Sequence, residues 1–432
     1  MMPKVGGFVG SVAVLTWLSW AGCGSEQPLC AQIGQQAPLG NSPLALTRNA
    51  KLLRAGDGFV LAGIDGTTVR WGQLSRTGTL SGESSFELPP TEKIATTAGG
   101  KPLGPLFAVT GKAAPGDQLV VITGVLQDQS KDHYELHAWV HDLGSQVQPT
   151  MHVVGVQMAV ANSGPIRLAV GNTANGKQAL VVWAVEGQAV PIHYQMLGPD
   201  GALVGKPGEI ADASYTARWT CLATAQNAQN LAVTLIESPN SSHPQWPRWR
   251  RFEIGDSGSM GGPAQIDLNL DVTDCRIVST HTSEGYLLAW QNNASNGGTS
   301  FASFVPSSPD SGTEAIDEVV TRPVLASAYY GGYAQMPKLD WIAPVGYEFT
   351  IGLVGSRGPE VRRFDLFADP KGRPLYLPSV AGNTDLISSW VGNDAVYVTY
   401  LDMPGSSTRA DAAVSGASQR YLVTVLSPDE RE

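Results

Sequence analysis

Residues 178–186 read QALVVWAVE, an unbroken run of aliphatic and aromatic side chains closed by one acidic residue. Six further runs of the same kind recur along the chain. They are residues 58–65 (GFVLAGID), 118–126 (QLVVITGVL), 230–237 (NLAVTLIE), 285–292 (GYLLAWQN), 346–354 (GYEFTIGLV) and 394–402 (DAVYVTYLD). The seven starts are 60, 60, 52, 55, 61 and 48 residues apart. Each run is too apolar for a strand with one wet face, so it predicts a strand covered on both faces.

Each apolar run has a shorter strand-like segment before it and another after it. The preceding segments are 51–54, 106–110, 166–170, 220–224, 274–279, 338–342 and 386–390. The following segments are 68–75, 135–143, 191–197, 248–254, 300–306, 360–367 and 418–426. The clearest internal echo is RRFEI at residues 250–254 against RRFDL at residues 362–366. Turn signals such as RTG at 76–78 and PDG at 199–201 predict hairpins between these segments.

A unit of three or four strands therefore repeats seven times, about once every 56 residues. Such units resemble the blades of seven-bladed β-propellers over essentially the whole body, which implies an all-β ring around a central channel. The last unit ends after its third strand, while residues 42–48 (SPLALTR) precede the first unit without a partner. We therefore expect residues 42–48 to complete the last blade and to close the ring.

The composition fits a folded body and argues against some partners. A formal charge of -10 without a basic run argues against nucleic-acid binding, because phosphate recognition needs clustered Lys and Arg. With 42% hydrophobic and 15% charged residues, the chain is not a disordered acidic segment. Its 49 glycines and 29 prolines indicate many turns between short strands.

The N-terminus carries an export signal. A lysine at position 4 precedes an uncharged apolar stretch over residues 5–20, which is shorter than the roughly 20 residues that span a bilayer. Residues 18–23 (LSWAGC) resemble a bacterial lipobox, with Trp20 where leucine is usual. The resemblance implies that Cys23 is lipidated and becomes the first mature residue. The alternatives are secretion without lipid and a retained amphiphilic anchor.

These observations predict three regions: a lipoprotein signal peptide (1–22), a flexible tether (23–41) and a β-propeller (42–432). They place the protein on the periplasmic or cell-surface side of a bacterial envelope, attached to a membrane through its lipid.

The predicted oxidising compartment bears on the state of the three remaining cysteines. Cys221 and Cys275 lie 54 residues apart, close to one repeat, in the first strands of neighbouring units. We expect a disulfide between them, with two separate buried thiols as the alternative. Cys30 lies in the tether and is left as a free thiol or an intermolecular link.

Two motifs with metal-ligand spacing fail on geometry. His133, His137 and His141 are four residues apart, but on a strand His137 and His141 are separated by about 13 Å. We therefore expect exposed strand histidines rather than a metal site. Residues 267–271 (DLNLD) mimic the start of a calcium loop, yet Val272 stands where the turn needs glycine. The sequence predicts no metal and no cofactor.

Two surfaces are candidates for recognition. His281 and Asp340, together with Arg276, are expected on inner strands near the channel mouth, where a solvated channel explains them equally well. Residues 239–249 (PNSSHPQWPRW) form a long excursion between two strands of the fourth unit. Its end and the strand after it carry four candidate contact residues for a sugar or protein: Trp246, Arg248, Trp249 and Arg250.

The first functional hypothesis is a non-enzymatic, lipid-anchored propeller that binds an envelope protein or glycan. The alternative is an extracytoplasmic glycan hydrolase or lyase with paired carboxylates at the channel mouth. A third hypothesis is an adhesin or sensor that presents the tryptophan loop. Fold alone does not choose among them, and no catalytic residue is assigned.

Overall fold

The structure is a computed structural model of the 432-residue chain. It describes residues 32–47, 50–55, 58–88, 105–111, 117–128, 133–145, 147–158, 166–172, 178–185, 192–210, 218–224, 231–238, 248–254, 264–267, 275–281, 285–292, 299–306, 322–325, 338–345, 348–355, 358–365, 375–376, 383–391, 395–403 and 418–426. No helix in these ranges is both long and apolar enough to cross a bilayer.

The described strands form seven antiparallel sheets of four strands each, which we call blades 1 to 7. Blades 1 to 3 are β2 (Lys51–Ala55), β3 (Gly58–Asp65), β4 (Thr68–Leu74) and β5 (Leu80–Glu87); β6 (Leu106–Gly111), β7 (Asp117–Asp128), β8 (His133–Asp142) and β9 (Thr150–Met158); and β10 (Ile166–Asn172), β11 (Ala179–Val185), β12 (Ile192–Leu197) and β13 (Leu203–Ile210).

Blades 4 to 6 are β14 (Arg218–Thr224), β15 (Leu231–Ser238), β16 (Arg248–Ile254) and β17 (Ala264–Asp267); β18 (Cys275–His281), β19 (Gly285–Asn292), β20 (Thr299–Pro306) and β21 (Arg322–Leu325); and β22 (Lys338–Val345), β23 (Glu348–Gly355), β24 (Gly358–Asp365) and β25 (Leu375–Tyr376). Blade 7 is β26 (Asn383–Val391), β27 (Ala395–Met403), β28 (Gln419–Leu426) and β1 (Gln32–Pro38).

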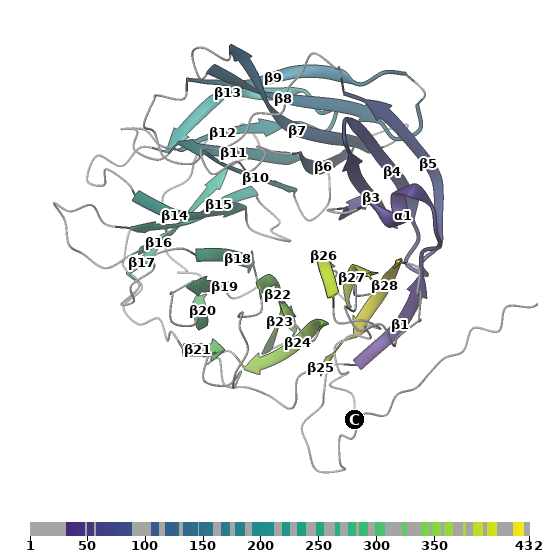
Figure 1. The fold of residues 1–432 in the computed structure, drawn as a ribbon. Helices are drawn as coiled ribbons and strands as arrows, with labels where there is room; N and C mark the ends of the chain where they lie inside the picture. Colours follow the sequence, from purple (N-terminus) through teal and green to yellow (C-terminus); the bar gives the residue numbers. More distant parts are fainter. Residues whose placement is uncertain are drawn as a thin grey trace, which may run out of the picture.

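The blades stand in a closed ring. The first strand of each blade contacts the first strand of the next, in the order β2, β6, β10, β14, β18, β22, β26 and back to β2. Figure 1 shows β6, β10, β18, β22 and β26 toward the centre of the ring and fourth strands such as β5, β9, β17, β21 and β1 at its rim. The expectation of an all-β ring of repeated sheets is confirmed.

The second strand of each well-described blade is buried on both faces, as its apolar run predicted. Val60, Leu61 and Ala62 in β3 are fully buried, as are Leu180 and Val181 in β11. One face of each strand packs against the preceding blade and the other against the following blade. One hydrophobic cluster thus joins β3 and β4 to β7 and β8, and another joins β7 and β8 to β11.

Two of the expected turns carry the left-handed glycine that their sequences signalled. Gly78, between β4 and β5, has φ 87°, and Gly201, between β12 and β13, has φ 71°. At Gly201 a Cβ would also lie 2.4 Å from a methyl carbon of Val140 in the neighbouring blade. Glycine is therefore needed there both for the turn and for the contact between blades.

The ring is closed by an N-terminal strand, but not by the segment expected. Strand β1 (Gln32–Pro38) pairs with β28 from Gln32↔Leu426 to Pro38↔Tyr421 and is the fourth strand of blade 7. The expectation that residues 42–48 form this strand is wrong, because residues 43–46 form the short helix α1 (Pro43–Leu46). Ser42 caps α1 by accepting the Ala45 N–H at 3.1 Å, and Pro43 suits the first turn. The ring thus includes part of the segment assigned to the tether.

Helix α1 fills the joint between blades 7 and 1, where a single buried cation holds it. The Arg420 guanidinium on β28 is fully buried and donates from Nε to the Ala45 carbonyl at 2.9 Å and from Nη2 to the Thr47 carbonyl at 2.7 Å. These carbonyl oxygens lie at the C-terminal end of α1, where backbone groups lack helical partners and favour a cation. Burial lowers the pKa of Arg420 to about 10, so it stays charged at neutral pH.

Replacement of this cation tests the closure. Arg420→Met should lower the free energy of unfolding by about 2–4 kcal/mol, because two buried carbonyl oxygens lose their donors. Lys206→Met, which removes an exposed cation from β13, is the matched control and should change stability by less than about 0.5 kcal/mol. Denaturant unfolding followed by tryptophan fluorescence measures both variants. Equal midpoints for the two variants would contradict a closing role for Arg420.

Candidate functional site

The predicted channel-mouth residues fall on first strands, but not at one end of the ring. Arg276 and His281 are the second and last residues of β18, and Asp340 is the third residue of β22. Arg276 and His281 are five positions apart on the strand, which corresponds to about 16 Å. The backbone therefore groups Arg276 with Asp340 and places His281 at the opposite end of β18. The side chains of these three residues lie outside the described part of the structure.

The predicted recognition loop is described only at its last residues. Arg248, Trp249 and Arg250 begin β16, the third strand of blade 4, opposite Glu237, Ile236 and Leu235 of β15. Their side chains, and Trp246 as a whole, lie outside the described residues. A recognition patch at this loop stays a prediction.

The disulfide and the lipid also stay predictions. Cys221 lies on β14 and Cys275 on β18, the first strands of adjacent blades, which contact one another. In their hairpins Cys221 stands opposite Ile236 and Cys275 opposite Asn292. Their side chains are outside the described part, as are Cys23 and Cys30.

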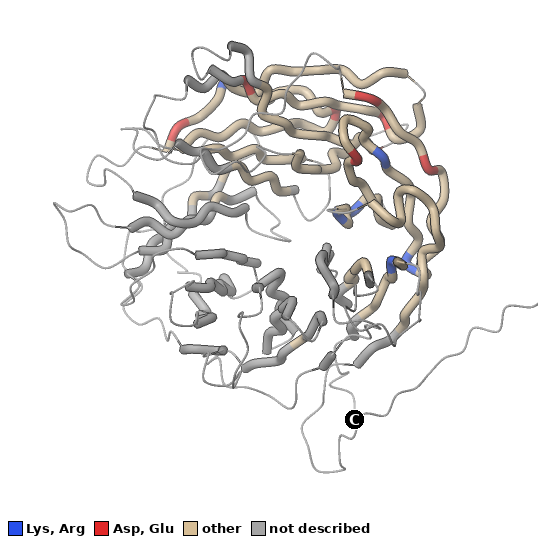
Figure 2. Tube along the Cα trace, in the orientation of Figure 1, with Lys and Arg blue, Asp and Glu red and all other residues tan. Residues whose placement is uncertain are grey.

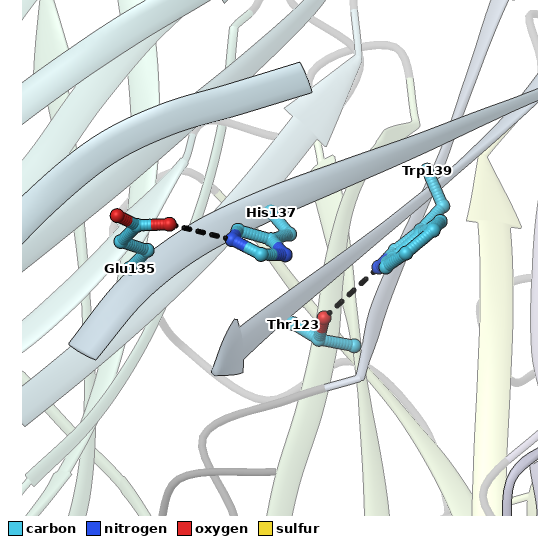
Figure 3. A network of polar contacts seen from close by, with 4 residues as sticks. All are labelled: Thr123, Glu135, His137 and Trp139. Atoms are coloured by element: carbon cyan, nitrogen blue, oxygen red, sulfur yellow. Dashed lines mark hydrogen bonds and ion pairs between the residues drawn. The ribbon is translucent and has the colours of Figure 1, made fainter. Parts of the chain in front are cut away.

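Two polar side-chain interactions of the described residues involve strand β8. The Nε2 atom of His137 lies 2.9 Å from Oε2 of Glu135 two residues earlier on the same face of the strand, and the Nε1–H group of Trp139 donates to Oγ1 of Thr123 at 3.3 Å (Figure 3). His137 stands directly opposite Thr123 of β7 in the sheet. Carboxylate, imidazole and hydroxyl are the residue types of a hydrolytic triad.

Burial excludes nucleophilic catalysis by this group in the closed ring. Thr123 is 1% exposed, and its hydroxyl oxygen already accepts the indole N–H of Trp139. A substrate carbonyl cannot reach that oxygen without separation of the blades. The arrangement orients His137 and satisfies polar groups beneath the surface, which is a structural role.

His137 and His141 of β8 are buried, which corrects the expectation of exposed strand residues for these two, while the side chain of His133 lies outside the described part of the structure. His137 is 3% exposed and His141 is 4% exposed. The reason is that β8 is the third strand of its blade and its face toward blade 1 is covered. The His141 ring packs beside two aromatic rings of blade 1, with its centroid 4.5 Å from that of Trp71 and 5.7 Å from that of Phe86.

Across the ranges that the structure describes, no three His, Cys, Asp or Glu side chains gather in a way that could hold an ion. His141 is enclosed by aromatic rings rather than by further ligands.

Comparison with known proteins bears on the fold. No protein-family model and no curated protein matches the sequence. The β-propeller domain of Nup133 from Vanderwaltozyma polyspora matches with a TM-score of 0.51 and 9% identity, over 91% of this chain and 100% of that chain. This fold is a β-propeller.

Two further solved structures match this chain with lower TM-scores. The Dos1 propeller has a TM-score of 0.43 and 10% identity over 91% of this chain and 94% of that chain. A chain from a study of two prolyl endopeptidases has a TM-score of 0.41 and 11% identity over 89% of this chain. The present chain spans 51% of the length of that prolyl endopeptidase chain. At these identities the likenesses concern the fold and not the activity.

Protonation of the enclosed histidine should weaken the propeller. Burial lowers the pKa of His141 from 6.5, and the backbone of Ser145 and Val147 and the Asp142 carboxylate oppose this only in part. The unfolded chain therefore binds a proton at His141 more readily than the folded chain does. The contribution of His141 to the free energy of unfolding is therefore full above pH 6.5 and is lost as the pH falls below it.

Thermal unfolding at about pH 7.5 and about pH 5.5, which bracket the ordinary histidine pKa, measures this loss. We expect a lower melting temperature at the acidic pH in the wild type, and a smaller difference in His141→Phe, which keeps an aromatic ring but cannot titrate. An identical pH dependence in both proteins would contradict this role of His141.

Proposed function

We propose that this chain is a lipid-anchored envelope propeller that serves as a non-enzymatic platform for an envelope protein or glycan. The observation that carries the proposal is the position of β1 at the outer edge of blade 7, after β26, β27 and β28. Gln32, the first residue that the structure describes, therefore lies at the rim of the ring. A lipid anchor at Cys23 would hold the ring from that side and would leave both ends of the channel accessible.

The distance to the membrane follows from the same strand. Gln32 lies nine positions after Cys23. A flexible chain of that length has a root-mean-square span of about 15–18 Å. The propeller would thus stand close beside the bilayer on its rim, in a position to hold a partner against the membrane surface.

The described polar groups fit a platform better than a hydrolase. The Glu135–His137 pair and Thr123 lie between blades 1 and 2, and the backbone separates the candidate channel residues Arg276 and His281 along β18. A glycan hydrolase needs two carboxyl groups about 5–10 Å apart in one open site. The proposed binding surface is instead the loop that leads into β16, with Trp246, Trp249 and the neighbouring arginines Arg248 and Arg250.

Membrane attachment is tested by replacement of the proposed lipidated residue. Cys23→Ser should move the protein from the detergent phase to the aqueous phase after Triton X-114 partitioning of whole envelopes, because a serine cannot accept the thioether-linked lipid. Ser25→Ala, a neighbouring change that keeps the cysteine, should leave the protein in the detergent phase. Retention of Cys23→Ser in the detergent phase would overturn the lipid anchor.

The platform is tested by cross-linking of intact envelopes. Wild-type protein should give discrete cross-linked adducts with an envelope component, and the double variant Trp246→Ala, Trp249→Ala should lose them while it keeps its melting temperature. Incubation of the purified protein with envelope glycan measures the enzymatic alternative. Release of reducing ends by the wild type, absent in Asp340→Asn, would replace the platform by a hydrolase.

A further inference from the structure

Apolar side chains that are exposed in the described structure gather on the rim of blade 2. Three of the five large exposed hydrophobic residues fall within seven positions: Val147 (73% exposed), Met151 (41%) and Val153 (40%). Met151 and Val153 lie on one face of β9, the fourth strand of the blade, and Val147 precedes that strand. The rim of blade 2 therefore carries a strip of solvent-exposed hydrophobic side chains.

This strip coincides with an open strand edge. In the sheet order β6-β7-β8-β9, no described strand pairs with the outer edge of β9 (Figure 1). Such an edge presents unpaired N–H and C=O groups and is normally protected from pairing with another chain by charges, proline or shortness.

The other outermost strands that the structure describes carry this protection. β5 holds Glu83 and Glu87, and β13 holds Lys206, Pro207 and Glu209. The rest carry a proline or a charge or are only two residues long: β1 with Pro38, β17 with Asp267, β21 with Arg322 and Pro323, and β25. β9 reads TMHVVGVQM over nine residues, with no Lys, Arg, Asp, Glu or Pro (Figure 2). All three well-described outer strands, β5, β9 and β13, contain a bulge, so a bulge does not distinguish β9.

We infer that the outer edge of β9 pairs antiparallel with β9 of a second copy of this chain. Charge is the argument for this occupant. The chain has a net charge of -10, so a partner that bound it through complementary charge would be basic and would need acidic groups to pair with. The strand β9 has no acidic residue. A charge buried against β9 would lack a partner and would be costly. A second β9 likewise has no Lys, Arg, Asp or Glu, and it brings its own row of N–H and C=O groups.

The two-fold arrangement also accounts for the exposed side chains. Antiparallel pairing of one strand with its own copy makes a self-complementary interface, in which each contact occurs twice. Met151 and Val153 of one copy then lie beside the same residues of the other on one continuous face. Two four-stranded blades become one eight-stranded sheet across the dimer.

Sedimentation velocity of the full chain in non-ionic detergent, between about 1 and 100 μM, tests the pairing, because a small interface dissociates in that range. Wild-type protein and Ser85→Lys, which adds a cation at an exposed position of β5, should form dimers. Val153→Lys should shift dissociation by at least about tenfold to higher concentration, because it buries an unpaired charge at each of two positions. Met151→Lys should do the same, which keeps the test decisive if one variant folds poorly.

Hydrogen exchange locates the contact. Amides of residues 150–158 should exchange more slowly at dimeric than at monomeric concentrations, whereas those of β5 and β13 should not change. A wild type that stays monomeric throughout the range overturns the inference, as does a dimer that Val153→Lys and Met151→Lys leave intact. Slowed exchange on β9 only in the presence of a different envelope protein would assign the edge to that protein instead.

Discussion

The ring depends on a buried guanidinium that binds two main-chain carbonyl oxygens. Each blade has two apolar faces, and all of these faces are covered by neighbouring blades only if the last blade packs against the first. At that joint Arg420 holds helix α1 in place. Around it, Leu44 and Ala45 of the helix pack with Phe59 of blade 1 and Tyr397 of blade 7. The carbonyl oxygens at the C-terminal end of α1 have no N–H partners within the helix. Their hydrogen bonds to Arg420 therefore offset part of the cost of removing its charge from water.

The second strand of each blade could be predicted from sequence because burial on both faces leaves a continuous apolar run. Third strands such as β16 (RWRRFEI) carry charges and were found by their place after that run. β3, β16 and β19 begin and end at the expected residues. The fourth strands gave no such signal: β5 (LSGESSFE) has one face in water and mixes polar with apolar residues. Residues 42–48 misled for a related reason. Leu44 and Leu46 alternate as in a strand, but Ser42 and Pro43 form a helix start, and glutamine-rich β1 supplies the strand instead.

The candidate site was less accessible to sequence reasoning. Spacing alone shows that Arg276 and His281 cannot share one end of a seven-residue strand once that strand is assigned. The burial of His137 and His141 could not be foreseen, because it depends on Trp71 and Phe86 from another blade. The bare edge of β9 was readable from its uncharged sequence, but only the sheet order shows that the edge is open.

The pairing of β1 with β28 sets an order of assembly. Gln32, near the start of the chain, has Leu426, near its end, as its partner, so the first strand synthesised waits for the last. Contacts between residues so far apart in sequence form late in folding, because the entropic cost of closing the long loop between them outweighs the first contacts that they make. Until then blades 1 and 7 each expose an apolar face, and β28 has an open edge. A chain interrupted before Arg420 would hold six complete blades and no closed ring, and would be prone to aggregate.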